Sequence, residues 1–84
     1  MGNLSDQDIA ILRFERDWWR RRTPKERSVR ELLGLSSTRY HQLLNSLIDR
    51  AEALAYDPML VGRLRRLRES RRRVRLARRS ALEL

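Results

Sequence analysis

The sequence predicts a small all-α domain of about four helices, and three observations lead to that fold class. Only three glycines and two prolines occur in 84 residues, so few residues break helices. Leucine, arginine and glutamate, which favour helices, recur throughout. Apolar residues recur at three- and four-residue spacing behind residues that cap helices. Because 40% of the residues are hydrophobic, the chain can form one modest core, and we expect one domain overall.

The first helix is expected over about residues 5–22. Ser5 is its predicted N-cap, and the acids that follow suit the positive end of a helix dipole. Trp18 and Trp19 lie near its end, and adjacent residues on a helix point about 100° apart. One tryptophan is therefore expected to anchor the core, and the other to be a half-exposed packing or contact residue.

The second helix is expected over residues 24–33, because residues 23–26 read Thr-Pro-Lys-Glu. Thr23 can cap the helix, proline suits the first helical position, and Glu26 completes a Thr-x-x-Glu capping box. Gly34 is placed to end the helix in the left-handed conformation.

The third helix, expected over residues 36–49, has the cleanest helical periodicity in the chain. Ser36 is its predicted N-cap. Its apolar positions follow i, i+3, i+4, i+7 and i+8, and they are Tyr40, Leu43, Leu44, Leu47 and Ile48. Because Tyr40 belongs to this stripe, we assign it to the core. Residues 50–56 are expected to form a short connection.

The fourth helix is expected to begin at Asp57-Pro58 and to run to about residue 77. Leu60, Leu64 and Leu67 give it an apolar stripe, which loses apolar residues further along the chain. The helix is expected to fray after Arg75. We therefore divide the chain into a core over residues 5–56 and an Arg-rich helix with a frayed tail over residues 57–84.

The net charge of +9 indicates a polyanionic partner. Residues 57–84 contain ten arginines and three acids, whereas the rest of the chain holds ten basic and eight acidic residues. Ten like charges on one helix repel one another, so this helix is expected to bind an external anion.

Residues 24–49 fit a helix-turn-helix motif, with Gly34-Leu35-Ser36 as the turn. The major groove of B-DNA admits one α-helix, and polar side chains near the N-terminus of that helix can bond base edges. The residues expected to read bases are Ser37, Thr38, Arg39, His41 and Gln42. The residues expected to bind phosphates are Ser36, Arg22, Lys25, Arg63, Arg65, Arg66, Arg72 and Arg73. The alternative readings are a plain αα-corner, with Ser36 only a cap and His41 only a solvated surface residue.

Other classes of function are disfavoured by the composition. No cysteine is present, no carboxylate pair accompanies a histidine, and no glycine-rich phosphate loop occurs. We therefore expect no enzyme activity, no metal and no cofactor. The N-terminus lacks the pattern of a signal peptide, and apolar runs stay far below the ~20 residues that span a bilayer. No membrane partner is expected, and the expected location is the cytoplasm, on the nucleoid.

Three segments form an unusual combination: Ile-Leu-Arg-Phe-Glu-Arg-Asp-Trp-Trp at 11–19, Ser-Thr-Arg-Tyr-His-Gln-Leu-Leu-Asn at 37–45 and Asp-Pro-Met-Leu-Val-Gly-Arg-Leu-Arg-Arg-Leu-Arg at 57–68. Over about residues 8–79 the chain resembles a family of short actinobacterial proteins long classed as a domain of unknown function. The third helix is also similar to the DNA-reading helix of region 4 of sigma factors. The resemblance implies a helix-turn-helix DNA binder of the nucleoid-associated kind, with the five base-reading residues in the groove. This chain has His41 and Ala51 where many relatives are expected to have an aromatic residue and proline.

Together these observations predict an architectural protein that binds double-stranded DNA with limited sequence readout and organises the chromosome. One rival is a conventional dimeric transcription regulator with few operators. Another is a sigma-like adaptor whose leucine stripe binds RNA polymerase, and RNA binding also stays open. A homodimer through Trp19 or the C-terminal stripe is compatible with the sequence, although nothing in the sequence requires it.

Overall fold

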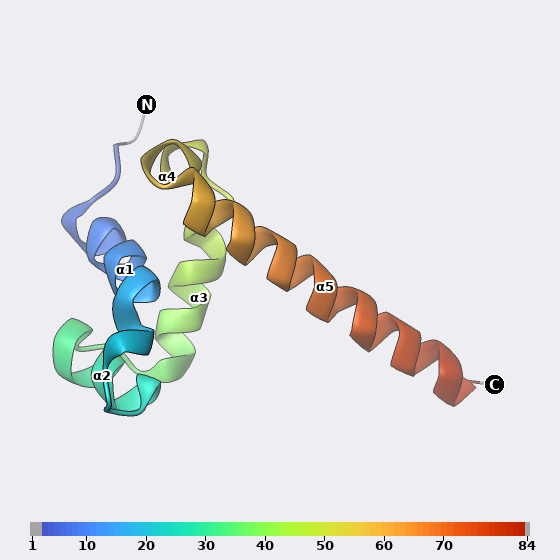
Figure 1. Cartoon of the computed structure of the whole chain (residues 1–84). Coiled ribbons are helices and arrows are strands. Elements are labelled where there is room, and N and C mark those ends of the chain that lie inside the picture. The colour runs from blue at the N-terminus through green and yellow to red at the C-terminus, as the bar shows by residue number, and fades with distance from the viewer. Residues whose placement is uncertain (1–2, 84) are drawn as a thin grey trace.

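A computed structural model describes residues 3–83, and within that part of the chain the secondary structure is entirely helical, which confirms the predicted all-α class. Five α-helices and one 3₁₀ turn follow one another (Figure 1). They are α1 (Asp6–Asp17), η1 (Trp18–Arg20), α2 (Lys25–Leu33), α3 (Ser37–Leu47), α4 (Ala51–Tyr56) and α5 (Pro58–Glu83).

The first helix starts as predicted and ends five residues earlier than predicted. The Ser5 hydroxyl accepts a hydrogen bond from the Asp8 amide at 3.0 Å, and the Asp8 carboxylate accepts one from the Ser5 amide at 2.9 Å. This reciprocal pair is a capping box. At Trp18 the chain tightens into η1, where Trp19 Nε1 donates to the Arg16 carbonyl at 3.0 Å. Trp18 packs against the core, whereas Trp19 is 63% exposed. This agrees with the prediction that one tryptophan anchors the core and that the other is partly exposed.

The predicted capping box at the start of α2 is wrong by one residue. Pro24, and not Thr23, is the N-cap, and no side-chain cap bond forms there. The Pro24 carbonyl instead accepts the Ser28 amide at 3.0 Å, so the helix begins at Lys25. The predicted end is confirmed, because Gly34 has φ of 67° in the left-handed region.

The third helix is capped at its start, and its apolar stripe packs into the core. The Ser36 hydroxyl accepts the Arg39 amide at 3.1 Å, which confirms the predicted cap. Tyr40 is fully buried, and its ring meets Phe14 edge-on with centroids 5.7 Å apart. The buried core comprises Ile11, Leu12, Phe14, Val29, Tyr40, Leu44, Leu47, Ile48, Ala53, Leu60 and Val61.

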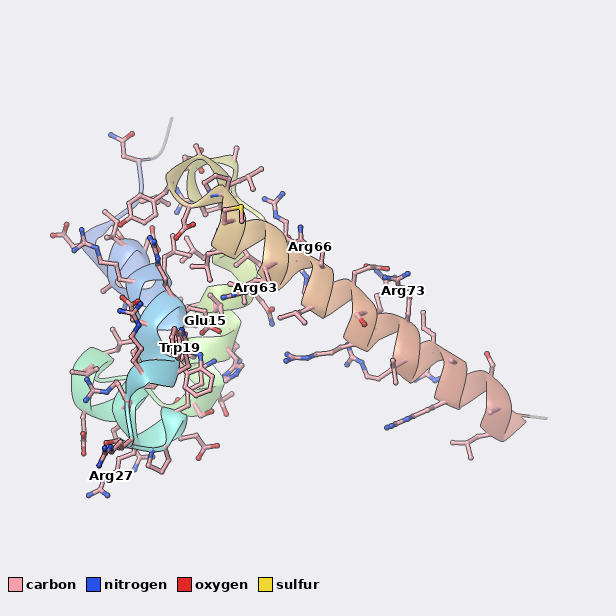
Figure 2. The ribbon with its side chains drawn as sticks, viewed as in Figure 1. Glu15, Trp19, Arg27, Arg63, Arg66 and Arg73 are labelled. Atoms are coloured by element: carbon pink, nitrogen blue, oxygen red, sulfur yellow. The ribbon has the colours of Figure 1, made fainter. Side chains whose placement is uncertain are left out.

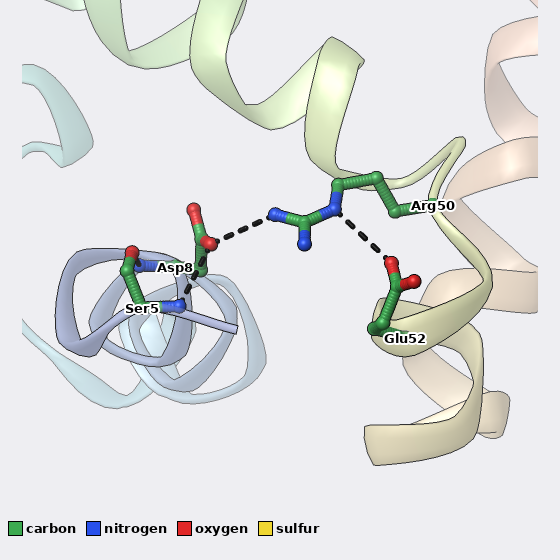
Figure 3. A network of polar contacts seen from close by, with 4 residues as sticks. All are labelled: Ser5, Asp8, Arg50 and Glu52. Carbon is green, nitrogen blue, oxygen red and sulfur yellow. Dashed lines mark hydrogen bonds and ion pairs between the residues drawn. The ribbon is translucent and has the colours of Figure 1, made fainter. Parts of the chain in front are cut away.

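The predicted connection over residues 50–56 is a helix, α4. Its Ala-rich composition favours helix, and Ala53 is buried in the core. Arg50, just before α4, donates to the Asp8 carboxylate at 3.0 Å and to Glu52 at 3.2 Å (Figure 3). The same Asp8 carboxylate caps α1, so this network joins the start of α1 to the start of α4.

The fifth helix is anchored at its start and continues beyond its predicted end. Asp57 caps it by accepting the Leu60 amide at 3.2 Å, and Leu60 and Val61 are buried in the core. It runs to Glu83, past the expected end at residue 77, because its residues are good helix formers. The tail expected to fray is thus helical as far as the structure describes it, and Leu84 lies outside the described residues. Side chains from Glu69 to Leu82 are exposed.

The resulting molecule has two arms that diverge from α4. Helices α1 to α3 form one arm, and α5 leaves them as a long single helix (Figure 1). The principal extents are 47 × 34 × 21 Å. Among the described helices, none is both long and apolar enough to cross a membrane.

Candidate nucleic-acid interface

A short turn joins α2 to α3, the two helices of the predicted helix-turn-helix. The left-handed Gly34 ends α2, Leu35 packs against the core, and Ser36 caps α3. Helices α2 and α3 both contact α1. The first turns of α3 therefore present a fixed polar face to solvent.

Three of the five predicted base-reading residues share the outward face of α3. Thr38, Arg39 and Gln42 are exposed, and Arg39 Nη1 lies 3.5 Å from Gln42 Oε1. Ser37, in the first turn, is only partly exposed. The structure therefore brings Thr38, Arg39 and Gln42 together at one surface.

His41 lies at the edge of this face. Its Nδ1 is 2.8 Å from the Ser37 carbonyl oxygen, and its ring meets the Tyr40 ring edge-on at a centroid distance of 5.4 Å. The side chain is exposed and borders the groove between α3 and α5.

Asn45 is a candidate contact that the predicted base-reading set omits. It is exposed, lies one turn beyond His41 and Gln42, and borders the same groove. Its spacing of three from Gln42 and four from His41 is the signal that places it on this face.

The main concave feature is an open groove of about 870 Å³ between α5 on one side and α3, η1 and the start of α2 on the other. Five arginines of α5 line it: Arg63, Arg68, Arg71, Arg75 and Arg78. We call these residues the groove face of α5. Among the described residues that line the groove, Glu15 is the only acid.

The charge of Glu15 is balanced inside the protein. The Lys25 ammonium lies 3.0 Å from Glu15 Oε2, and the Tyr40 hydroxyl donates to the same oxygen. Burial, followed by the bond to Glu15, raises the pKa of Tyr40 far above its ordinary value, so the phenol stays protonated. The groove therefore keeps a strongly positive potential.

Lys25 was predicted to bind phosphate, but its ammonium is turned inward. It stands over the rings of Trp18 and Tyr40, 4.8 and 5.6 Å from their centroids, in addition to pairing with Glu15. Such a cation–π and ion-pair setting holds the ammonium in place. Lys25 therefore supports the position of α3 and is not available as a free phosphate contact.

The predicted phosphate residues of α5 lie on different sides of the helix. Successive residues turn by about 100°, so Arg66, Arg72 and Arg73 point away from the groove. We call these three residues the back face. Figure 2 shows Arg63 on the side of α5 toward α1 and α3, and Arg66 and Arg73 on the other side. Of the predicted phosphate residues on α5, only Arg63 lines the groove.

Sequence reasoning missed Arg68, Arg71, Arg75 and Arg78 as groove residues. A signal was present for Arg71, because it continues the Leu60, Leu64, Leu67 stripe, whose first two members pack on the core.

Two arginines of α5, Arg65 and the groove residue Arg68, contact the end of α3. Arg65, which was predicted to bind phosphate, donates from Nε to the Ile48 carbonyl at 2.5 Å. Arg68 pairs with both oxygens of Asp49, at 2.5 and 3.3 Å, and donates to the Asn45 carbonyl at 3.3 Å. The hydrogen bond from Arg68 holds the pKa of Asp49 below its ordinary value. This clasp joins α5 to the carbonyl end of α3, where cations are favoured.

The two remaining predicted phosphate residues lie just before helices: Arg22 before α2 and Ser36 before α3. Arg22 is exposed in the loop between η1 and α2. Ser36 is exposed, but its hydroxyl is used in capping α3.

A second hollow, of about 590 Å³, lies between α1 with η1 on one side and the end of α4 with Asp57 on the other. Arg13 Nε donates to the Tyr56 hydroxyl there at 3.2 Å, and Arg16 lies 3.5 Å from the Asp57 carboxylate. Asp17 and Asp57 offset its arginines, so it lacks the charge excess of the groove. Within residues 3–83, no group of three or more His, Cys, Asp or Glu side chains could hold a metal ion.

Residues 3–76 match the family described as "Protein of unknown function (DUF3263)". The chain belongs to this family. The match spans α1 to α4 and α5 as far as Leu76, so both walls of the groove lie within the DUF3263 region except at Arg78. No curated protein and no solved structure matches the chain significantly.

Proposed function

We propose that this DUF3263 protein binds double-stranded DNA, with the N-terminal half of α3 in the major groove and the groove face of α5 on the phosphates. The observation that carries the proposal is the groove itself. Its α5 wall holds five arginines, of which Arg68 alone pairs with an acid, Asp49, and the one acid that lines the groove is neutralised by Lys25. A surface with this charge excess selects a polyanion.

Duplex DNA fits this surface better than a single strand because of α3. A helix is about 10–12 Å across and the major groove is about 12 Å wide. Thr38, Arg39 and Gln42 project from the early turns of α3, where base edges are reached in helix-turn-helix complexes. Arg39 suits guanine and Gln42 suits adenine.

The balance of contacts favours an architectural role on the chromosome. Few side chains of α3 are available to read bases, whereas arginines on α5 are many and contact any sequence alike. The resemblance to actinobacterial nucleoid-associated proteins and to the DNA-reading helix of sigma region 4 supports the same assignment.

The test is fluorescence anisotropy of a labelled duplex, which measures the binding constant K at salt concentrations from about 50 to 200 mM. The logarithm of K falls linearly with the logarithm of the salt concentration, and each neutralised phosphate contributes about 0.9 to the magnitude of the slope. Wild type should show a slope that corresponds to several phosphates. Arg71→Gln with Arg75→Gln should flatten the slope by about two. Arg66→Gln with Arg72→Gln removes the same charge from the same helix and is the matched control, expected to leave the slope nearly unchanged. Absence of duplex binding, or a slope near zero, would contradict the proposal.

A second measurement separates the architectural role from its rivals. Immunoprecipitation and sequencing of DNA bound in cells should recover hundreds of sites that share a short motif. A few sharp peaks would favour a conventional regulator, and retention of RNA polymerase without direct duplex binding would favour an adaptor.

A further inference from the structure

The back face of α5 carries a charge that the proposed function does not use. Arg66 and Arg73 form one row, seven residues or two turns apart, and Arg72 lies about 100° around the helix from Arg73. All three side chains are exposed, and none forms an ion pair with a residue that the structure describes. Glu69 is the one acid placed between them in the described helix.

The arginines of the back face point to the other side of α5 from the groove that α3 borders. Arg71, Arg75 and Arg78 turn toward the groove that α3 borders, whereas the back face turns away from it. The body of a helix about 10–12 Å wide stands between the two faces. The DNA that contacts one face therefore leaves the other in solvent.

The chemistry of the back face fits one kind of occupant. Three arginines against one acid attract a polyanion, and arginine pairs with phosphate through two parallel N–H bonds. A second copy of this chain is disfavoured, since each copy carries a net charge of +9. A duplex offers regularly spaced phosphates along the length of a straight helix.

We propose that the back face of α5 binds a second DNA duplex, so that one chain bridges two duplexes. This proposal rests on the proposed function, because the first duplex must occupy α3 and the groove face. The two faces then act as independent phosphate-binding surfaces on opposite sides of one helix.

The test is a capture assay with the full chain. One duplex is fixed to beads, and a labelled duplex of the same sequence is offered in solution. Wild type should retain the labelled duplex. Arg66→Gln/Arg72→Gln/Arg73→Gln should lower capture at least about tenfold while single-duplex affinity stays within about threefold, because only the second surface loses its phosphate contacts. Glu69→Gln, which removes the acid of the back face, should raise capture.

The matched control is Arg71→Gln/Arg75→Gln/Arg78→Gln, which removes the same charge from the groove face. It should lower single-duplex affinity and capture together. Circular dichroism confirms that each variant keeps its helix content.

Three outcomes would overturn the bridging proposal while leaving duplex binding intact. One is wild-type protein that binds a single duplex but captures no second one. Another is equal loss of single-duplex affinity in both triple variants, which would place the two faces on one duplex. The third is capture that rises with the square of protein concentration, which would assign bridging to a protein dimer. Failure of wild type to bind any duplex would instead overturn the proposed function.

Discussion

The Tyr40 hydroxyl of α3 donates a buried hydrogen bond to the Glu15 carboxylate of α1. Lys25 of α2 completes the arrangement through its ammonium, 3.0 Å from the same carboxylate. Three helices thus meet at one charged group inside the core. Because its partners come from α2 and α3, the carboxylate fixes the angle at which α3 is presented.

We predict that Glu15→Gln lowers the free energy of unfolding by about 2 kcal/mol, because it leaves the half-buried Lys25 ammonium without its counter-charge. Urea denaturation measures the loss. The control is Glu31→Gln, which breaks an exposed pair with Arg27 on α2 and should cost less than about 0.5 kcal/mol. Equal losses in the two variants would show that the buried carboxylate contributes no more than a surface pair.

Two glycine substitutions should act in opposite directions. Gly34→Ala should destabilise the fold by about 1 kcal/mol, because φ of 67° strains any side chain even though the space around a Cβ is open. Gly62→Ala, inside α5, should stabilise it by up to about 1 kcal/mol, since the nearest group is the flexible end of Arg66 at 3.4 Å. Urea midpoints of the two variants give the signs. Destabilisation by Gly62→Ala would mean that the Arg66 side chain cannot give way.

Substitutions on α3 should change sequence preference. Arg39→Ala and Asn45→Ala remove exposed side chains from the outward face and the groove edge of α3. Loss of a base contact costs about 1–3 kcal/mol and relaxes preference at one position of the site. Selection of bound sequences from a random duplex pool, with Arg27→Ala on α2 as control, measures this. An unchanged motif with either variant would remove that residue from base reading.

The Asp49–Arg68 clasp should make stability sensitive to acid. Arg68 lowers the pKa of Asp49, so the stabilisation is fully present above the ordinary carboxylate pKa and is lost as pH falls through the lowered value. Asp49→Asn should remove this part of the pH dependence, as measured by urea unfolding across the acid range. The variant should also bind duplex DNA more tightly, since it removes a negative charge beside Arg68. A pH profile identical to that of wild type would show that the clasp adds no stability.

Helicity of the outer part of α5 should rise with salt. Its arginines repeat at spacings of three and four, as in Arg71, Arg75 and Arg79, and like charges at i, i+4 destabilise a helix. Raising salt from about 50 to 500 mM shortens the range of this repulsion, so ellipticity at 222 nm should become more negative. Arg75→Glu places a carboxylate four residues from both neighbours and should reduce the salt effect. A salt response of the same size in Arg75→Glu would contradict the electrostatic explanation.

The sequence predicts the helical class, the turn at Gly34, the caps at Ser5 and Ser36 and the helix start at Asp57-Pro58, because each depends on neighbours in the chain. The break at Trp18 could not be foreseen, since helix-favouring residues continue through it and the 3₁₀ turn depends on how Trp18 packs. Helix α4 was missed because no side-chain cap marks its start.

The candidate site was less predictable than the fold. Composition alone shows that α5 is basic, but the contacts of Leu60 and Val61 with the core decide which arginines turn toward α3. The inward turn of Lys25 depends on Glu15, ten residues earlier, and the bond of Arg65 to Ile48 depends on how two helices cross. Such contacts arise only in the folded chain.

The clasp between Arg68 and Asp49 lies near the fixed end of a helix that is 26 residues, or about 39 Å, long. Helix α5 therefore pivots about its contact with the end of α3. From Arg68 to Glu83 the helix spans about 22 Å at a rise of about 1.5 Å per residue, so a tilt of about 10° at this clasp would carry the far end through about 4 Å. The Arg68–Asp49 pair and the bond from Arg65 to the Ile48 carbonyl thus help to set how wide the two arms open around whatever lies between them.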